Sequence, residues 1–212
     1  LAGAFATPSE LQSNIVAKIG NTVLPNFVPV SNISTDHGHS EIVISNTNPG
    51  AFDITLNGAI ENTFGATTIS NAGGNIIANA GAKIVSNGQH ISSGVNGIVL
   101  AADKGYIGSS TARLQTESSL LDASALNSIY INAFSGDLVL DTIESSAGDV
   151  VLLALGSILD GNVDDPNNTN ISATSGQVRL SAQEGSIGTG GVDPLTGETD
   201  LGANALEIDT SS

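Results

Sequence analysis

The chain reads Gly148-Asp149-Val150-Val151-Leu152-Leu153-Ala154-Leu155-Gly156-Ser157-Ile158, a short apolar run enclosed by two glycines and followed by an isoleucine. Close variants of this phrase occupy residues 97–108 and 176–188, and a shorter one occupies residues 136–141. Short apolar runs that recur between glycines are typical of a solenoid, in which each coil buries its apolar edge only by stacking on the next coil.

The strand candidates recur roughly every 8–12 residues, a spacing that fits an antiparallel sandwich or barrel as well as a solenoid. Two features favour stacking. The phrase Gly105-Tyr106-Ile107-Gly108 returns as Gly185-Ser186-Ile187-Gly188, and asparagines recur at turns, where stacked carboxamides can bond to each other. The sequence therefore predicts an all-β fold, a parallel β-helix over residues 42–212. We expect aliphatic side chains to fill its bore, among them Val150, Leu152, Val178 and Leu180.

A family resemblance rests on several phrases, namely Thr67–Ile77, Gly136–Leu140, Gly148–Asn162, and Gly185–Gly188 with Ala205–Asp209. They resemble the repeat regions of very large bacterial surface proteins of the filamentous-haemagglutinin kind. The resemblance covers roughly residues 42–212. It implies a right-handed parallel β-helix, export to the cell surface or beyond, and a structural or adhesive role.

The first 41 residues differ from the repeats. Thr7-Pro8-Ser9-Glu10 has the form of a helix start, and Leu11, Ile15 and Ile19 then recur every four residues. The pattern predicts a short helix over about 8–19, which either covers the open end of the solenoid or links it to a preceding domain. At the other end, Leu206–Thr210 reads as a strand without a cap. We therefore expect the stack to continue, in the same polypeptide or in a second subunit joined end to end.

The composition narrows the classes of function. The chain has 5 Lys and Arg against 21 Asp and Glu, a net charge of -16, which argues against binding to nucleic acid or to anionic lipid. Cysteine is absent, so disulfides and thiolate chemistry are excluded. No apolar run is long enough to span a membrane. An acidic surface suits a soluble, secreted protein, and it also attracts divalent cations.

One acidic turn has the start of a calcium loop. Asp160, Asn162 and Asp164 stand at alternate positions, so their oxygens can converge on one ion. The turn departs from an EF-hand, because Asp165 replaces the invariant glycine and Ile171 the bidentate glutamate. Calcium is thus the one cofactor that we predict, and a solvated acidic turn is the alternative. Stacked acidic turns would also bring like charges within about 5 Å, which a divalent ion would relieve.

The histidines predict no metal centre. His37 and His39, with Glu41 beside them, can point to one side of a strand, but no third strong ligand is near in sequence. We expect a loop with two exposed histidines, and His90 on a turn surface.

Catalysis is not expected. The five basic residues are scattered, aromatic residues make up only 3% of the chain, and no Gly-x-Ser-x-Gly motif is present. The sequence predicts a non-catalytic structural segment of an extracellular fibre or adhesin-like surface protein. The expected partners are copies of itself, joined end to end or laterally, and a host or neighbouring cell surface. A β-helix that binds or degrades polysaccharide is the alternative, since that fold also carries such enzymes.

Overall fold

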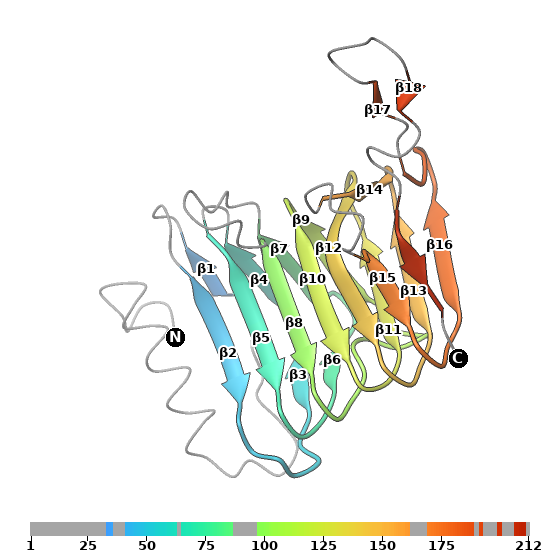
Figure 1. Cartoon of the computed structure of the whole chain (residues 1–212). Helices are drawn as coiled ribbons and strands as arrows, with labels where there is room; N and C mark the ends of the chain where they lie inside the picture. The colour runs from blue at the N-terminus through green and yellow to red at the C-terminus, as the bar shows by residue number, and fades with distance from the viewer. Residues whose placement is uncertain are drawn as a thin grey trace.

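The computed structural model describes residues 33–35, 41–62, 65–86, 97–161, 169–188, 191–192, 199–200 and 206–210. In that part of the chain every regular element is a β-strand, and successive coils stack into a solenoid (Figure 1). The predicted all-β parallel β-helix is therefore confirmed. The helix predicted over 8–19 lies outside the described residues. No helix long and apolar enough to cross a membrane occurs among the described residues.

Two long sheets form the main faces of the stack. Sheet A contains, in spatial order, β1 (Ile33–Thr35), β4 (Ala59–Asn62), β7 (Lys83–Ser86), β9 (Leu114–Ser118), β11 (Ile129–Ala133), β13 (Val150–Ala154) and β16 (Val178–Ala182). Sheet B contains β2 (Ile42–Asn46), β5 (Thr67–Asn71), β8 (Ile98–Ala102), β10 (Leu121–Ala125), β12 (Leu138–Ser145), β15 (Ile171–Ala173) and β19 (Ile208–Asp209). The chain therefore winds alternately through the two sheets.

Short strands complete the coils. A narrow third face contains β3 (Ile54–Leu56) and β6 (Ile76–Ala78), and β14 (Ile158–Asp160) pairs with the first half of β12. The strands β17 (Gly191–Val192) and β18 (Thr199–Asp200) form an antiparallel hairpin that projects from the stack (Figure 1). All other pairings between described strands are parallel.

The core is a set of columns that run through the coils. Alternate residues of each strand point inward, so residues in register form a column of buried side chains. One such column in sheet B contains Ile44, Ile69, Leu100, Ala123, Ile143 and Ile171, all at most 1% exposed. Aliphatic residues of medium size therefore fill the bore, as the sequence predicts.

The predicted core residues divide into two groups. Val150 and Leu152 of β13 are fully buried. Val178 and Leu180 of β16 are in register with them, but they are only partly buried. The difference arises because β16 is the last described strand of sheet A, so no further coil covers its side chains.

Hydrogen bonds at the corners tie each coil to the next. A side-chain oxygen in one coil accepts the backbone N–H of the equivalent residue in the following coil. At the corner before sheet A, Asp53 accepts from Asn75 (2.8 Å), Asn75 from Tyr106 (3.0 Å), Ser128 from Asp149 (3.0 Å), and Asp149 from Gln177 (2.9 Å). At the corner after sheet A, Asp137 accepts from Ser157 (2.7 Å) and Ser157 from Ser186 (3.2 Å). We call these two series the corner ladders.

The glycines of the repeated phrase let the coils approach closely at the corners. A Cβ on Gly105 would lie 2.3 Å from the carbonyl oxygen of Gly74, and one on Gly176 would lie 2.0 Å from that of Gly148. Neither position has room for a side chain. This explains why a glycine directly precedes so many of the polar residues in the corner ladders.

Two similar phrases lie at different corners. Ile107 pairs with Ile76 and Ile129 before sheet A, whereas Ile187 pairs with Ile158 after sheet A. The likeness of Gly105–Gly108 to Gly185–Gly188 is therefore not a long structural period. In both phrases a glycine allows close approach, and the next residue donates its backbone N–H to the ladder, Tyr106 to Asn75 and Ser186 to Ser157.

The expected asparagine contacts are present at two turns, one of which joins Asn79 to Asn57. Asn46 donates from Nδ2 to the Oδ1 of Asn71, one coil further on, at 2.9 Å. Asn71 is fully buried and donates to the carbonyl oxygens of Phe52 (2.9 Å) and Asn75 (2.8 Å). These bonds satisfy backbone groups of the bend that would otherwise be buried without partners.

The burial difference between β13 and β16 predicts unequal effects of two matched substitutions. Leu152→Ala should lower the free energy of unfolding by about 2–5 kcal/mol, because it leaves a cavity in the closed bore. Leu180→Ala should cost about 1–2 kcal/mol, because less apolar area leaves the core. Urea denaturation followed by circular dichroism measures both. Equal losses would contradict the partly buried position of Leu180.

The corner ladders predict a difference between two substitutions at one residue. Asp149→Ala should cost about 1 kcal/mol, because the N–H of Gln177 loses its acceptor. Asp149→Asn keeps an oxygen there and should stay within about 0.5 kcal/mol of the parent. Amide hydrogen exchange at Gln177 should be faster in the alanine variant alone. Equal exchange in both variants would show that the side chain does not hold the next coil.

Candidate functional site

The structure places one of the three predicted calcium ligands. Asp160 is the last residue of β14 and is half-buried, and its Oδ1 accepts a hydrogen bond from Nδ2 of Asn170 at 2.8 Å. Asn170 is fully buried and accepts the N–H of Glu207 at 3.0 Å, so it joins two coils. Asn162 and Asp164 lie outside the described residues. Asp160 thus takes part in a bond that holds the loop, and the convergence of the three oxygens stays a prediction.

The register of the described strands shows how their acidic residues are arranged from coil to coil. Where the register is unbroken, no acidic residue stands directly opposite another acidic residue, but at the bulge in β12 Asp122 and Asp141 directly follow the paired Leu121 and Leu140. Glu144 lies between Ser124 and Ser172, and Glu61 and Glu117 are both opposite Val85. The expectation concerned stacked acidic turns rather than strands, so the proposed relief of their repulsion by calcium stays a prediction.

Of the histidine positions and Glu41, the structure describes only Glu41. Among the described residues there is no group of three or more His, Cys, Asp or Glu side chains placed to hold a metal ion. His37, His39 and His90 lie outside them, and Glu41 is exposed.

A shallow groove of about 390 Å³ lies at one edge of sheet A, on its outer surface. Residues from five successive coils line it, so it runs along the stack. Its polar lining contains Asn79, Thr111, Arg113, Gln115, Asn132 and Gln183, and its apolar lining contains alanines and Leu153. No carboxylate lines it. In a chain with 21 acidic residues, this surface is therefore chemically distinct.

Two of the four carboxamides in the groove, those of Asn132 and Gln115, are joined by a hydrogen bond. Asn132 donates from Nδ2 to Oε1 of Gln115 at 2.7 Å, and Gln115 donates from Nε2 to the carbonyl oxygen of Arg113 at 3.4 Å. These two hydrogen bonds do not use the Oδ1 of Asn132 or the second N–H of each amide, so those groups can bond to a ligand. The half-buried Arg113 has its Nε buried without a hydrogen-bond partner among the described residues.

The last described coil presents an open apolar end. Ile187 is 50% exposed and Ile208 is 46% exposed, whereas their partners one coil earlier, Ile158 and Ile171, are fully buried. The corner residues of this coil, among them Gln177 and Ser186, are exposed as well. The columns of the core therefore end there with their side chains half covered.

Sequence reasoning missed the groove. It counted Arg113 only as one of several scattered basic residues, because Asn132 becomes its neighbour only through strand pairing. The alternation of Gln115 and Asn132 with buried residues along β9 and β11 marks them as outward-facing, and that is the signal the sequence offers.

No family model, curated protein or solved structure matches this chain.

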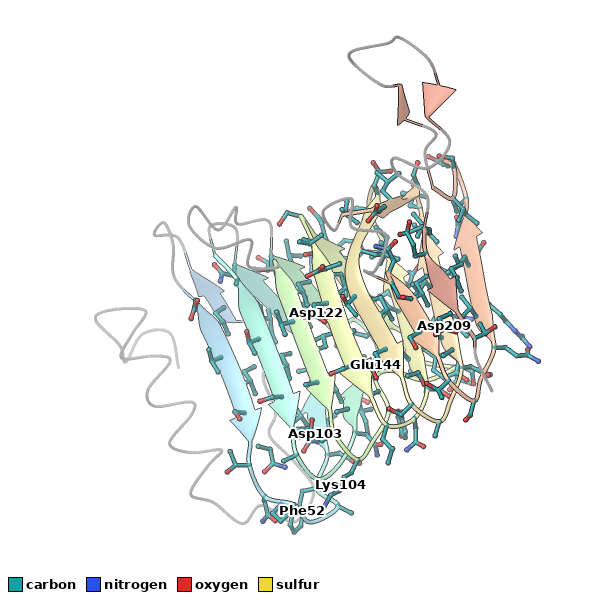
Figure 2. The ribbon with its side chains drawn as sticks, viewed as in Figure 1. Phe52, Asp103, Lys104, Asp122, Glu144 and Asp209 are labelled. Atoms are coloured by element: carbon teal, nitrogen blue, oxygen red, sulfur yellow. The ribbon has the colours of Figure 1, made fainter. Side chains whose placement is uncertain are left out.

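The loop after Asp160 predicts a response to calcium. Calcium at about 1 mM should raise the melting temperature, because a site present only in the folded stack stabilises it, and a chelator should reverse the effect. Asp164→Ala should blunt the response. The control is Asp103→Ala, which removes the same charge from an exposed corner (Figure 2). Identical melting curves with calcium and with chelator would leave Asp160 in a solvated, hydrogen-bonded turn.

Proposed function

We propose that this chain is a structural segment of an extracellular fibre or adhesin-like surface protein. Its role is to add length to a stack. The observation that carries the proposal is the open end, where continuous buried columns stop at half-exposed Ile187 and Ile208. Apolar columns that end in solvent favour the addition of a further coil, because that coil would remove their last side chains from water.

Three finer features belong to the same proposal. The coils are right-handed, because crossovers between parallel strands of one sheet are right-handed in about 98% of cases. A short helix forms over residues 8–19, where the sequence has the pattern of a helix start. The segment is non-catalytic, and its acidic surface keeps it soluble outside the cell.

The contacts between copies run end to end. The sides of the stack carry polar or charged residues at many outward positions, such as Ser45, Ser70 and Ser124 of sheet B. The end instead exposes isoleucines and the unpaired edge of β16. A heterologous contact of this kind does not close on itself, and it therefore produces a filament.

Sedimentation velocity over protein concentrations from about 10 μM to 1 mM tests the mode of assembly. The parent chain should form oligomers whose length grows with concentration. Ile187→Lys should abolish them, because it places a charge in the apolar end. The control Thr68→Lys, on the outer face of sheet B, should leave them intact. Loss in the control alone would indicate lateral association instead.

Two observations on native material complete the test. An intact mass near 21.2 kDa supports assembly from subunits, and a far larger mass supports one giant chain. Electron microscopy should show rods or fibres in either case. Compact particles would contradict the structural role.

A further inference from the structure

We propose that the groove on sheet A binds a linear saccharide that carries a carboxylate, with Arg113 as the carboxylate-binding residue. The proposal goes beyond the structural role, because a stack can add length without binding any ligand on its side.

The first step is the state of Arg113. The described part of the chain holds four basic side chains, and three of them have a clear partner. Lys83 pairs with Glu61 at 3.4 Å, Lys104 donates to the carbonyl oxygen of Pro49 at 3.3 Å, and Arg179 donates to Oε1 of Gln177 at 2.9 Å. Arg113 alone among them has a buried Nε that donates to nothing in the described chain. The Nε itself is closed to solvent, so a ligand in the groove would meet the terminal nitrogens of the guanidinium, to which the described chain offers no hydrogen bond or ion pair.

The second step is the charge of the ligand. A guanidinium binds a carboxylate through two parallel hydrogen bonds. The groove has one positive charge and no carboxylate, within a chain of net charge -16. The long-range field of the protein repels polyanions, so the groove favours a ligand with isolated single charges over one with a dense phosphate backbone.

The third step is the rest of the ligand. Four carboxamides and the hydroxyl of Thr111 line the groove, and each carboxamide both donates and accepts hydrogen bonds. Such a set matches a ligand rich in hydroxyl groups. The bond between Asn132 and Gln115 fixes the amide orientations in advance, which lowers the entropy lost on binding. The small alanines leave a shallow floor without deep pockets for the side chains of a peptide.

The fourth step is the shape. The lining comes from five successive coils, and neighbouring parallel strands lie about 4.8 Å apart. The groove is thus about 20 Å long and open along the stack axis. An extended chain of sugar units fits this form better than a compact metabolite does.

The test uses as probes three unsulfated tetrasaccharides that carry a carboxylate on every second sugar only: hyaluronan, chondroitin and heparosan. Each is titrated to about 10 mM into ¹⁵N-labelled protein and followed by NMR. At least one should bind saturably and shift the backbone amides of Ala80, Thr111, Gln115 and Asn132. The methyl-esterified form of that probe, which lacks the charge, should bind more weakly. Absence of binding by all three would overturn the proposal, and equal binding of the ester would overturn the role of the carboxylate.

Matched variants locate the contact. Arg113→Gln should weaken binding about tenfold or more, because it removes a charged hydrogen-bond donor. Arg179→Gln removes the same charge from the same sheet outside the groove, and should change binding by less than about twofold. Equal weakening in both variants would reduce the effect to general electrostatics and overturn the site.

A third variant keeps the test valid if Arg113→Gln is unstable. Ala80 is exposed at the edge of the groove, so Ala80→Trp should fill the groove and leave the core unchanged. It should abolish binding while the melting temperature stays within a few degrees of the parent. Undiminished binding by Ala80→Trp would place the ligand elsewhere and overturn the proposal.

Discussion

The structure depends on the hydrogen bonds between successive coils. No coil has a core of its own, because each consists of short strands of two to eight residues joined at tight corners. A coil becomes stable only when its backbone groups and corner side chains find partners one coil away, as Asp149 does with Gln177. This requirement fixes the register, and the register then decides which side chains enter the bore and which meet solvent. The glycines at the corners follow from the same requirement, since the backbones approach too closely there for a Cβ.

A strand could be predicted from the sequence where the segment is apolar throughout, or where apolar and polar residues alternate regularly. Residues 150–154 and 97–102 are apolar runs bounded by glycine, and both are strands as expected. The segment Ala59–Asn62 gave no such signal, because its buried Asn62 is polar and its exposed Glu61 is charged. The strand β12 runs to Ser145, but a bulge interrupts its alternation. Leu121 pairs with Leu140 and Ala123 pairs with Ile143, so β12 has one extra residue between the two pairs.

The groove could not be predicted, because the strand pattern does not show how many residues separate two outward-facing residues that lie side by side in neighbouring coils. Ile131 pairs with Leu114, Leu152 with Ile131, and Leu180 with Leu152, and the three separations differ widely. The corners between the strands vary in length, and insertions there cost little in loop closure. A sequence pattern therefore identifies which residues of a strand face outward, but it does not identify which residue of the next coil lies beside them. Arg113 and Asn132 became neighbours only in the folded stack.

The two faces of each strand obey opposite rules, and this explains how so acidic a chain can stack. Inside, like residues favour one another, since isoleucine over isoleucine keeps a column filled. Outside, like charges repel at the strand spacing of about 4.8 Å. Asp122, Glu144 and Asp209 lie on the outer face of sheet B, on separate strands (Figure 2). Ser172 separates Glu144 from Asp209, which doubles their spacing to about 10 Å, near the range at which salt screens them. The repeated phrase accordingly returns with its apolar inward residues kept and its outward residues changed, as Val150-Val151-Leu152-Leu153 and Val178-Arg179-Leu180-Ser181 show.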